Sequence, residues 1–200
     1  MTTADAQPKS YDPVMQTVHW LTLLLICGVY TAAWIAHSGM AGEWFQPVFQ
    51  LHRSLGLTVF ALTVFRLVWH RLARIPRLPV DLHPLQKLAA RANEALLYLL
   101  LLAQPILGLL HTNARGQQVD VFFLGRLPAL IGAHRPLARE LHDLHALAAN
   151  VLLALIGLHA AAALYHHFIR GDDVLDAMLP RGLRGFGRSI FALVLRKEHS

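Results

Sequence analysis

The chain has 200 residues, of which 55% are hydrophobic and only 15% are charged, and this balance excludes an ordinary soluble domain of that length. The formal net charge is +6, but the basic residues flank the apolar stretches and form no stripe between aromatic side chains, which argues against nucleic-acid binding. The single cysteine, Cys27, excludes an internal disulfide and a cysteine-based zinc cluster. We therefore expect an integral membrane protein.

Four uncharged stretches predict four membrane-spanning helices, because a helix needs about 20 mostly apolar residues to cross a bilayer. The second stretch is short only because Arg66 interrupts it, and Arg53 can snorkel at its other end. The first is too long for the apolar part of a signal peptide, so we expect it to be retained. The stretches are Pro13 to Gly42, Ser54 to Phe65, Ala95 to Ala114 and Leu144 to Ile169. The fold class expected is all-α, an integral membrane four-helix bundle.

The polar segments between these stretches divide the chain into three parts. Residues 1–16 form a polar N-terminal lead, residues 17–182 the four-span membrane domain, and residues 183–200 a basic amphipathic tail. The tail is typical of a helix on an anionic membrane surface, and a partner-binding tail is the alternative. Within the domain, residues 39–50 form a short link, residues 73–91 a connection that ends in a short surface helix, and residues 117–140 a segment over the bundle or in the interface.

Lysine and arginine are distributed unequally between the two sides of the predicted bundle. Thirteen of the eighteen lie on the side of the two termini and five on the other side. The positive-inside rule therefore places both termini in the cytoplasm. We expect the membrane to be a bacterial-type inner membrane.

Thirteen histidines are present, and four of them lie at or inside the predicted spans. These four are His19, His52, His145 and His159. An ionisable side chain inside a membrane is costly and usually has a functional partner. The other histidines fall at span ends or in loops, where solvated histidine is ordinary.

Helix geometry sorts the four histidines into two pairs. His159 follows His145 by fourteen residues, which is about 21 Å and about four turns, so both lie on one face of the fourth helix. Because successive spans run in opposite directions, His52 lies opposite His145 on one side of the membrane, and His19 lies opposite His159 on the other. His142 is a rival to His145, but it faces about 100° away from His159. Facing imidazoles in a bundle core are a natural way to hold haem iron from both sides.

Small residues near the paired histidines leave space for a flat macrocycle, although they also let helices pack closely. They are Gly56, Ala149 and residues 160–163. The alternative is a purely structural role, in which the four histidines are buried and bonded to neighbouring helices. A zinc site or a proton-coupled transporter is disfavoured, because the spans contain no Asp or Glu.

Arginines near the two histidine pairs are candidates for binding the cofactor. Arg66 follows His52 by fourteen residues and so lies on almost the same helix face, at the level of the His19 pair. A haem propionate would neutralise it, and snorkelling is the alternative. Two roles are open for the arginines on the other side, which are Arg53, Arg135 and Arg139. They either bind the propionates of the second haem or form a basic mouth that concentrates a small anion.

Three stretches carry a resemblance to a known family: QTVHWL at 16–21, LHRSLG at 51–56, and GLHAAAALYHHF at 157–168. Over residues of about 14 to 182 the chain resembles the bacterial cytochrome b561 family, and within it the small di-haem members that take electrons from superoxide and give them to ubiquinone. The resemblance implies four bundled helices, two haem b groups, and axial ligands at the four paired histidines.

The function expected is electron transfer between a periplasmic donor, for which superoxide is the best choice, and the quinone pool. This would make the chain a superoxide:quinone oxidoreductase, with membrane lipid, quinone and superoxide or a periplasmic redox protein as partners. One alternative is a membrane-anchor electron-transfer subunit for a separate periplasmic redox protein, and another is a haem-free helical protein. His166, His167 and Arg170 are candidate neighbours of the quinone.

Overall fold

The computed structural model describes residues 10–73, 76, 82–122 and 125–184. Its four long helices are α1 (Pro13–His37), α2 (Phe45–Leu72), α3 (Pro84–Ala114) and α4 (Arg135–Tyr165), and the π-helical turn η2 (His166–Arg170) continues α4. All four are long and apolar enough to cross a membrane. The predicted all-α bundle of four spans is confirmed, and the chain is a multi-pass membrane protein.

Three of the long helices begin in the same way, with a side-chain cap followed by a proline in the first turn. In α1 the carboxylate of Asp12 accepts hydrogen bonds from the backbone N–H groups of Val14 and Met15, at 3.0 and 3.1 Å. In α3 the His83 ring accepts from the Leu85 N–H, and in α4 the His134 ring accepts from the Leu137 N–H. Proline is tolerated there because the first N–H groups of a helix have no partner within it.

Helices α2, α3 and α4 extend beyond the uncharged stretches that predicted them. Helix α1 begins at Pro13, where its uncharged stretch begins but inside the segment assigned to the polar lead, and α2 begins at Phe45, inside the predicted link. Helix α3 is continuous from Pro84, so the predicted short surface helix is its first part. Helix α4 already begins at Arg135, so the connection before it ends there and not at residue 140. A helix keeps its hydrogen bonds where it leaves the apolar layer, whereas the uncharged stretch marks only that layer.

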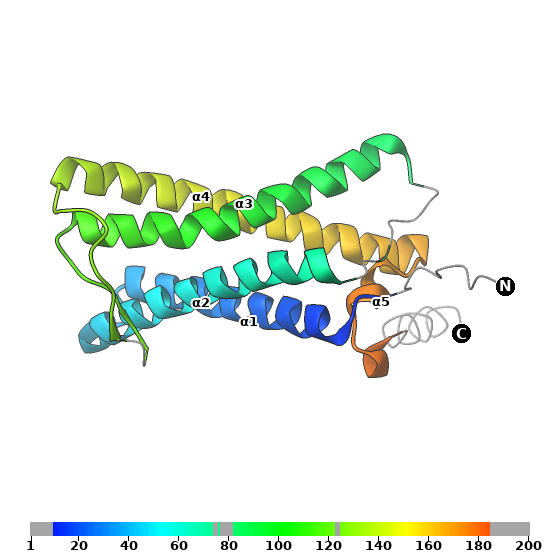
Figure 1. Cartoon of the computed structure of the whole chain (residues 1–200), viewed down its shortest axis with the longest axis horizontal. Coiled ribbons are helices and arrows are strands. Elements are labelled where there is room, and N and C mark those ends of the chain that lie inside the picture. The colour runs from blue at the N-terminus through cyan, green and yellow to red at the C-terminus, as the bar shows by residue number, and fades with distance from the viewer. Residues whose placement is uncertain (1–9, 74–75, 77–81, 123–124, 185–200) are drawn as a thin grey trace.

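The bundle consists of two helical hairpins, with α1 packed on α2 and α3 on α4, and α2 also contacts α3 (Figure 1). A small core of Val59, Leu101 and Leu152 joins them. Many large apolar side chains point outward, as the 68% exposed fraction of Leu24 shows. Such outward leucines suit a surface that faces lipid.

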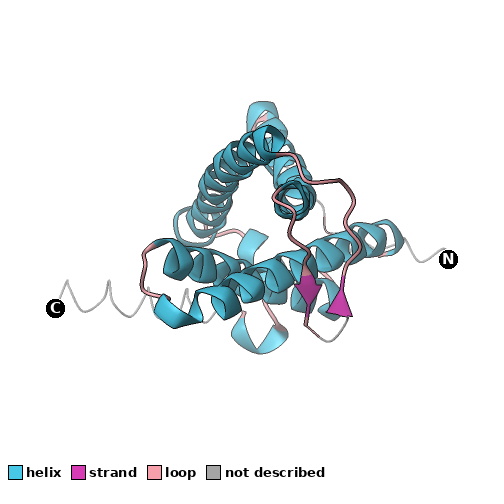
Figure 2. Ribbon diagram, turned by 90° about the vertical axis from the view of Figure 1, so that its left-hand side faces the viewer, coloured by secondary structure: helices cyan, strands magenta, loops and turns pink. Residues whose placement is uncertain are grey.

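The two ends of the bundle carry different structures. At the hairpin end, the strands β1 (Asp120–Val121) and β2 (Gly125–Arg126) pair antiparallel across the helix ends, and the 3₁₀ turn η1 (Gly42–Trp44) joins α1 to α2 (Figure 2). At the opposite end, called the terminal end here, lie the first described residues, the short helix α5 (Val174–Met178) and the 3₁₀ turn η3 (Arg181–Leu183) (Figure 1).

The segment before α4 is held over the bundle by polar contacts. The hydroxyl of Ser54 donates to the carbonyl oxygen of Asp120 at 3.3 Å, and the neighbouring side chains of Val119 and Val121 are buried. The predicted amphipathic tail lies almost wholly outside the described residues, because the description ends at residue 184.

Candidate functional site

Two pairs of histidines face one another across the bundle, one pair toward each end. His52 of α2 and His145 of α4 have ring centroids 6.3 Å apart, with ring planes at 79°. His19 of α1 and His159 of α4 have centroids 6.2 Å apart, with ring planes at 56°. The structure therefore brings together the same partners that helix geometry pairs.

The spacing of each pair fits a single metal ion held from both sides. An imidazole nitrogen lies roughly 1.1 Å from its ring centroid, so an atom midway between two centroids 6.2 or 6.3 Å apart would lie about 2 Å from a nitrogen that faces it. That is the length of an imidazole–metal bond. Beside the pair at the hairpin end, a Cβ added to Gly56 would meet nothing within 4 Å, so the helix surface is open one turn after His52.

The rings at the hairpin end are fixed by backbone carbonyls. His52 Nδ1–H donates to the carbonyl oxygen of Val29 at 3.0 Å, and His145 Nδ1–H donates to that of Gln104 at 3.1 Å. Because a carbonyl only accepts, both protons sit on Nδ1, and Nε2 of each ring keeps its lone pair. This is the arrangement typical of metal-binding histidines.

Helix α3 supplies two residues to this site that the sequence reasoning missed. Gln104 Nε2–H donates back to the backbone oxygen of His145 at 3.1 Å, which makes the contact between the two residues reciprocal. A Cβ placed on Gly108 would lie 3.3 Å from His145 Cε1, so a side chain there would press on the ring. Gln104 offered a signal, since it is a polar residue inside an otherwise apolar span.

The pair at the terminal end is held differently. No ring nitrogen of His19 or His159 bonds to another residue in the described part of the chain. The indole of Trp20 meets the His19 ring edge-on, with centroids 5.4 Å apart. Arg66 lies close enough to both rings to act on them electrostatically, and its guanidinium carbon is 5.4 Å from the Tyr98 ring centroid.

Each histidine pair has beside it a buried arginine nitrogen that finds no hydrogen-bond partner in the described part of the chain. Among the described residues, Nε of Arg53 and Nε of Arg66 are buried without a hydrogen bond. Arg53 follows His52 directly, and its terminal nitrogen donates to Gln117 Oε1 at 3.0 Å. A buried donor without an acceptor is costly. An anionic group at each end would satisfy both, and haem carries such groups as its propionates.

Two further histidines meet near the hairpin end. The rings of His111 and His142 have centroids 5.2 Å apart, and His111 Nδ1–H donates to the carbonyl oxygen of Ala138 at 2.9 Å. Sequence reasoning placed His111 among the ordinary solvated histidines and treated His142 as a rival to His145. It is His145, not His142, that faces His52.

A polar cavity of about 820 Å³ opens at the hairpin end. Its lining includes Gln50, Arg53, Gln117, Asp120 and Arg126. The residues Arg135 and Arg139, expected to join a basic mouth, are exposed on the first turns of α4 and are not among those that line it.

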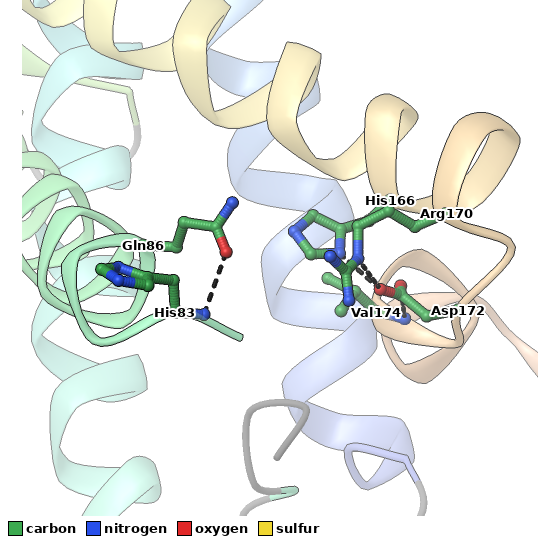
Figure 3. Close-up of polar contacts among 6 residues, drawn as sticks. All are labelled: His83, Gln86, His166, Arg170, Asp172 and Val174. Atoms are coloured by element: carbon green, nitrogen blue, oxygen red, sulfur yellow. Dashed lines mark hydrogen bonds and ion pairs between the residues drawn. The ribbon is translucent and has the colours of Figure 1, made fainter. Parts of the chain in front are cut away.

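The candidate quinone neighbours His166, His167 and Arg170 lie at the terminal end and contact acidic residues of the following segment. His166 Nδ1 and Arg170 Nε both bond Asp172 Oδ2 (Figure 3). The same view shows the separate cap of α3, in which the backbone N–H of His83 donates to the side chain of Gln86. Burial raises the pKa of the Asp172 carboxyl, but hydrogen bonds from His166 and the Val174 N–H outweigh it, and the net pKa is lowered.

The chain matches known proteins along nearly its whole length. The family model described as prokaryotic cytochrome b561 matches residues 10–181. A protein named cytochrome b561 homolog 2 from Escherichia coli is 32% identical over 184 residues, which cover 90% of this chain and 96% of the relative. A probable superoxide oxidase, CybB, from Yersinia pestis is 32% identical over 176 residues, which cover 86% of this chain and 97% of the relative.

Cytochromes b carry haem without a covalent link, and the two facing histidine pairs, the free Nε2 atoms at the hairpin end and the unpartnered arginine nitrogens fit such a group. The chain belongs to the prokaryotic cytochrome b561 family of membrane electron-transfer proteins.

Proposed function

We propose that the protein holds two b-type haems, one between His52 and His145 and one between His19 and His159, and that it transfers electrons from a periplasmic donor to the quinone pool. The observation that carries this proposal is the pair of centroid distances, 6.3 and 6.2 Å, at opposite ends of one bundle. A lone histidine pair would suggest one cofactor with access from one side. Two pairs at different depths provide a path through the membrane.

Haem, when bound, supplies a site that takes up and gives up one electron at a time. The protein contributes the axial nitrogens, their orientation and an apolar surrounding. His52 and His145 are held by the carbonyl groups of Val29 and Gln104. Arg53 and Arg66 would each give a buried N–H donor to a propionate.

The orientation proposed places the hairpin end in the periplasm and both termini in the cytoplasm of a bacterial inner membrane. The distribution of the eighteen lysines and arginines supports this orientation, because thirteen of them lie on the side of the termini. We assign residues 17–182 to one membrane domain and residues 183–200 to a separate tail; the end of the family match at residue 181 supports the second boundary, whereas the match and α1 both begin before the first.

Superoxide is the donor that we propose for the periplasmic side. The cavity of about 820 Å³ is lined by two cations, Arg53 and Arg126, and by one anion, Asp120, which pairs with Arg126 at 3.4 Å, so the lining keeps a net positive charge. Cationic side chains around a concave surface raise the local concentration of a small anion. The Yersinia pestis relative is itself named a probable superoxide oxidase, which agrees with this choice.

The test is to expose the purified haem-loaded protein to superoxide and follow the reduced haem bands, with superoxide dismutase as the control. We expect reduction that dismutase abolishes, and reoxidation on addition of a short-chain ubiquinone. The variant Arg53→Gln should slow the reduction and weaken its dependence on salt. Full haem loading without reduction by superoxide would refute this donor and favour a periplasmic redox protein.

A further inference from the structure

A mostly apolar groove of about 570 Å³ runs along the first half of α1 at the terminal end. One wall comes from α1 and the other from the segment after α5. Its lining includes Thr17, Trp20, Leu21 and Leu24 on the first side, and Leu179 and Leu183 on the second. A volume of this size suits a ring-shaped head group with part of a tail.

Three hydrogen bonds hold the last residues of α5, from which the second wall continues, against α1 and the residues just before it. The carbonyl oxygen of Ala177 accepts from the Tyr11 backbone N–H at 3.0 Å and from Gln16 Nε2 at 3.2 Å. The carbonyl oxygen of Met178 accepts from Trp20 Nε1 at 3.0 Å. Gln16 is itself buried, so its bond is shielded from water. The groove is therefore built into the fold, and a ligand would not have to create it.

Trp20 connects this groove to one of the histidine pairs. Its indole lines the groove, and its ring centroid lies 5.4 Å from that of His19. His19 in turn faces His159. A molecule in the groove would be separated from the His19 ring by one aromatic side chain, which is a short distance for an electron to cross.

The groove opens where a membrane-dissolved molecule can reach it. Leu21 and Leu24 belong to the span Pro13–His37 and have exposed fractions of 41% and 68%. Thr17 lies one turn before Leu21, and its hydroxyl makes no hydrogen bond to any described residue. A polar donor thus stands at the terminal end of a mostly apolar groove, whose other polar side chain, Gln16, already donates its amide to the backbone.

We propose that this groove binds the head group of a quinone, with its tail leaving past Leu21 and Leu24 into the bilayer. The proposal rests on the proposed function, and it deepens that function by placing the electron acceptor. Each quinone takes up two electrons and two protons to become a quinol, while two molecules of a one-electron donor are oxidised. A lipid acyl chain would match the apolar walls but would leave the Thr17 hydroxyl without an acceptor.

The test uses the full haem-loaded chain in lipid nanodiscs with a photoreactive azido-ubiquinone, followed by mapping of the labelled segment. We expect the label in α1, with displacement by excess ubiquinone. The variant Leu21→Trp fills the groove and should reduce labelling by about tenfold or more. The control Leu96→Trp adds the same bulk at an outward leucine of α3, with an exposed fraction of 45%, and should leave labelling unchanged.

Label in α3 or α4 instead of α1, or equal loss of label in both variants, would overturn the proposal. Label in α1 that excess lipid displaces and ubiquinone does not would show an acyl-chain groove only, and would overturn it too. Haem content and donor-driven haem reduction are measured on the same samples. If the haem content is low and the donor does not reduce the haem, while ubiquinone still displaces the label, the result contradicts the proposed function but not the groove.

Discussion

The two histidine pairs have almost the same spacing but different surroundings. At the hairpin end, both His52 and His145 donate from Nδ1 to backbone carbonyls. At the terminal end, His19 and His159 have no such bond within the described residues. An arginine cation lies near each pair, Arg53 at the hairpin end and Arg66 at the terminal end, so the Nδ1–H bonds are what distinguishes the two sites. A donated Nδ1–H makes an imidazole a stronger ligand and favours oxidised iron. We expect the hairpin-end haem to have the lower potential, which directs electrons toward the terminal end.

The largest expected effect comes from removing one ligand. His159→Ala should lower the haem content from two to one per chain, with the helices intact by circular dichroism, because the hairpin-end pair does not involve this residue. His142→Ala is the matched control on the same helix, and it should retain two haems. Two haems in the His159→Ala protein would show that the terminal-end pair is not a haem site.

The next effect concerns the buried arginine of the terminal end. Arg66→Gln removes the cation near His19 and His159, so the potential of that haem should fall toward that of the other. A hydrogen bond to a charged group contributes about 1.5–3 kcal/mol, so the dissociation constant of that haem should also rise by about tenfold or more. Spectroscopic redox titration checks the first result, and haem transfer to apomyoglobin checks the second.

Arg53→Gln provides the comparison for that experiment. It should affect the hairpin-end haem alone, because Arg53 lies beside His52. An equal change at both haems in either variant would contradict the separation of the two sites.

A smaller change is expected at Gln104. Gln104→Leu keeps the shape but removes the N–H that donates to the His145 backbone oxygen at 3.1 Å. The loss should be about 1 kcal/mol of stability, since one net hydrogen bond disappears. Electron paramagnetic resonance should show an altered signal for the hairpin-end haem only. An unchanged signal would mean that the amide does not orient the ring.

The smallest effect is a dependence of stability on pH. The pKa of Asp172 is lowered in the fold, so its contribution is present above the unfolded pKa, near 3.8, and is lost as the pH falls through the folded pKa. Asp172→Asn should therefore reduce thermal stability at neutral pH and flatten its loss on acidification. Parallel acid curves for the two proteins would contradict this account of the contacts with His166 and Arg170.

The sequence predicted the spans and the facing histidines well, because both follow from regular helix geometry. Apolar length identifies a membrane helix, and a separation of fourteen residues places His145 and His159 on one face. The helix ends were predicted less well. His134 and Pro136 mark the start of α4, but the uncharged stretch that predicted this helix begins only at Leu144.

Other features depend on how the helices are rotated about their axes, which one sequence does not reveal. The contact between His111 and His142 is one example, and the carbonyl of Val29 that fixes His52 is another. The groove beside Trp20 also escaped prediction, because its second wall is the short segment after α5, which the backbone carbonyls of Ala177 and Met178 hold near α1. Hydropathy carries no information about such contacts.

The proposed pairing of the four histidines is tested first by the reduced-minus-oxidised visible spectrum of the purified protein, with haem measured per polypeptide. We expect two b-type haems per chain, with two resolvable potentials. One haem would contradict the pairing of His19 with His159 or of His52 with His145, and no haem after expression with ample haem supply would contradict the account as a whole.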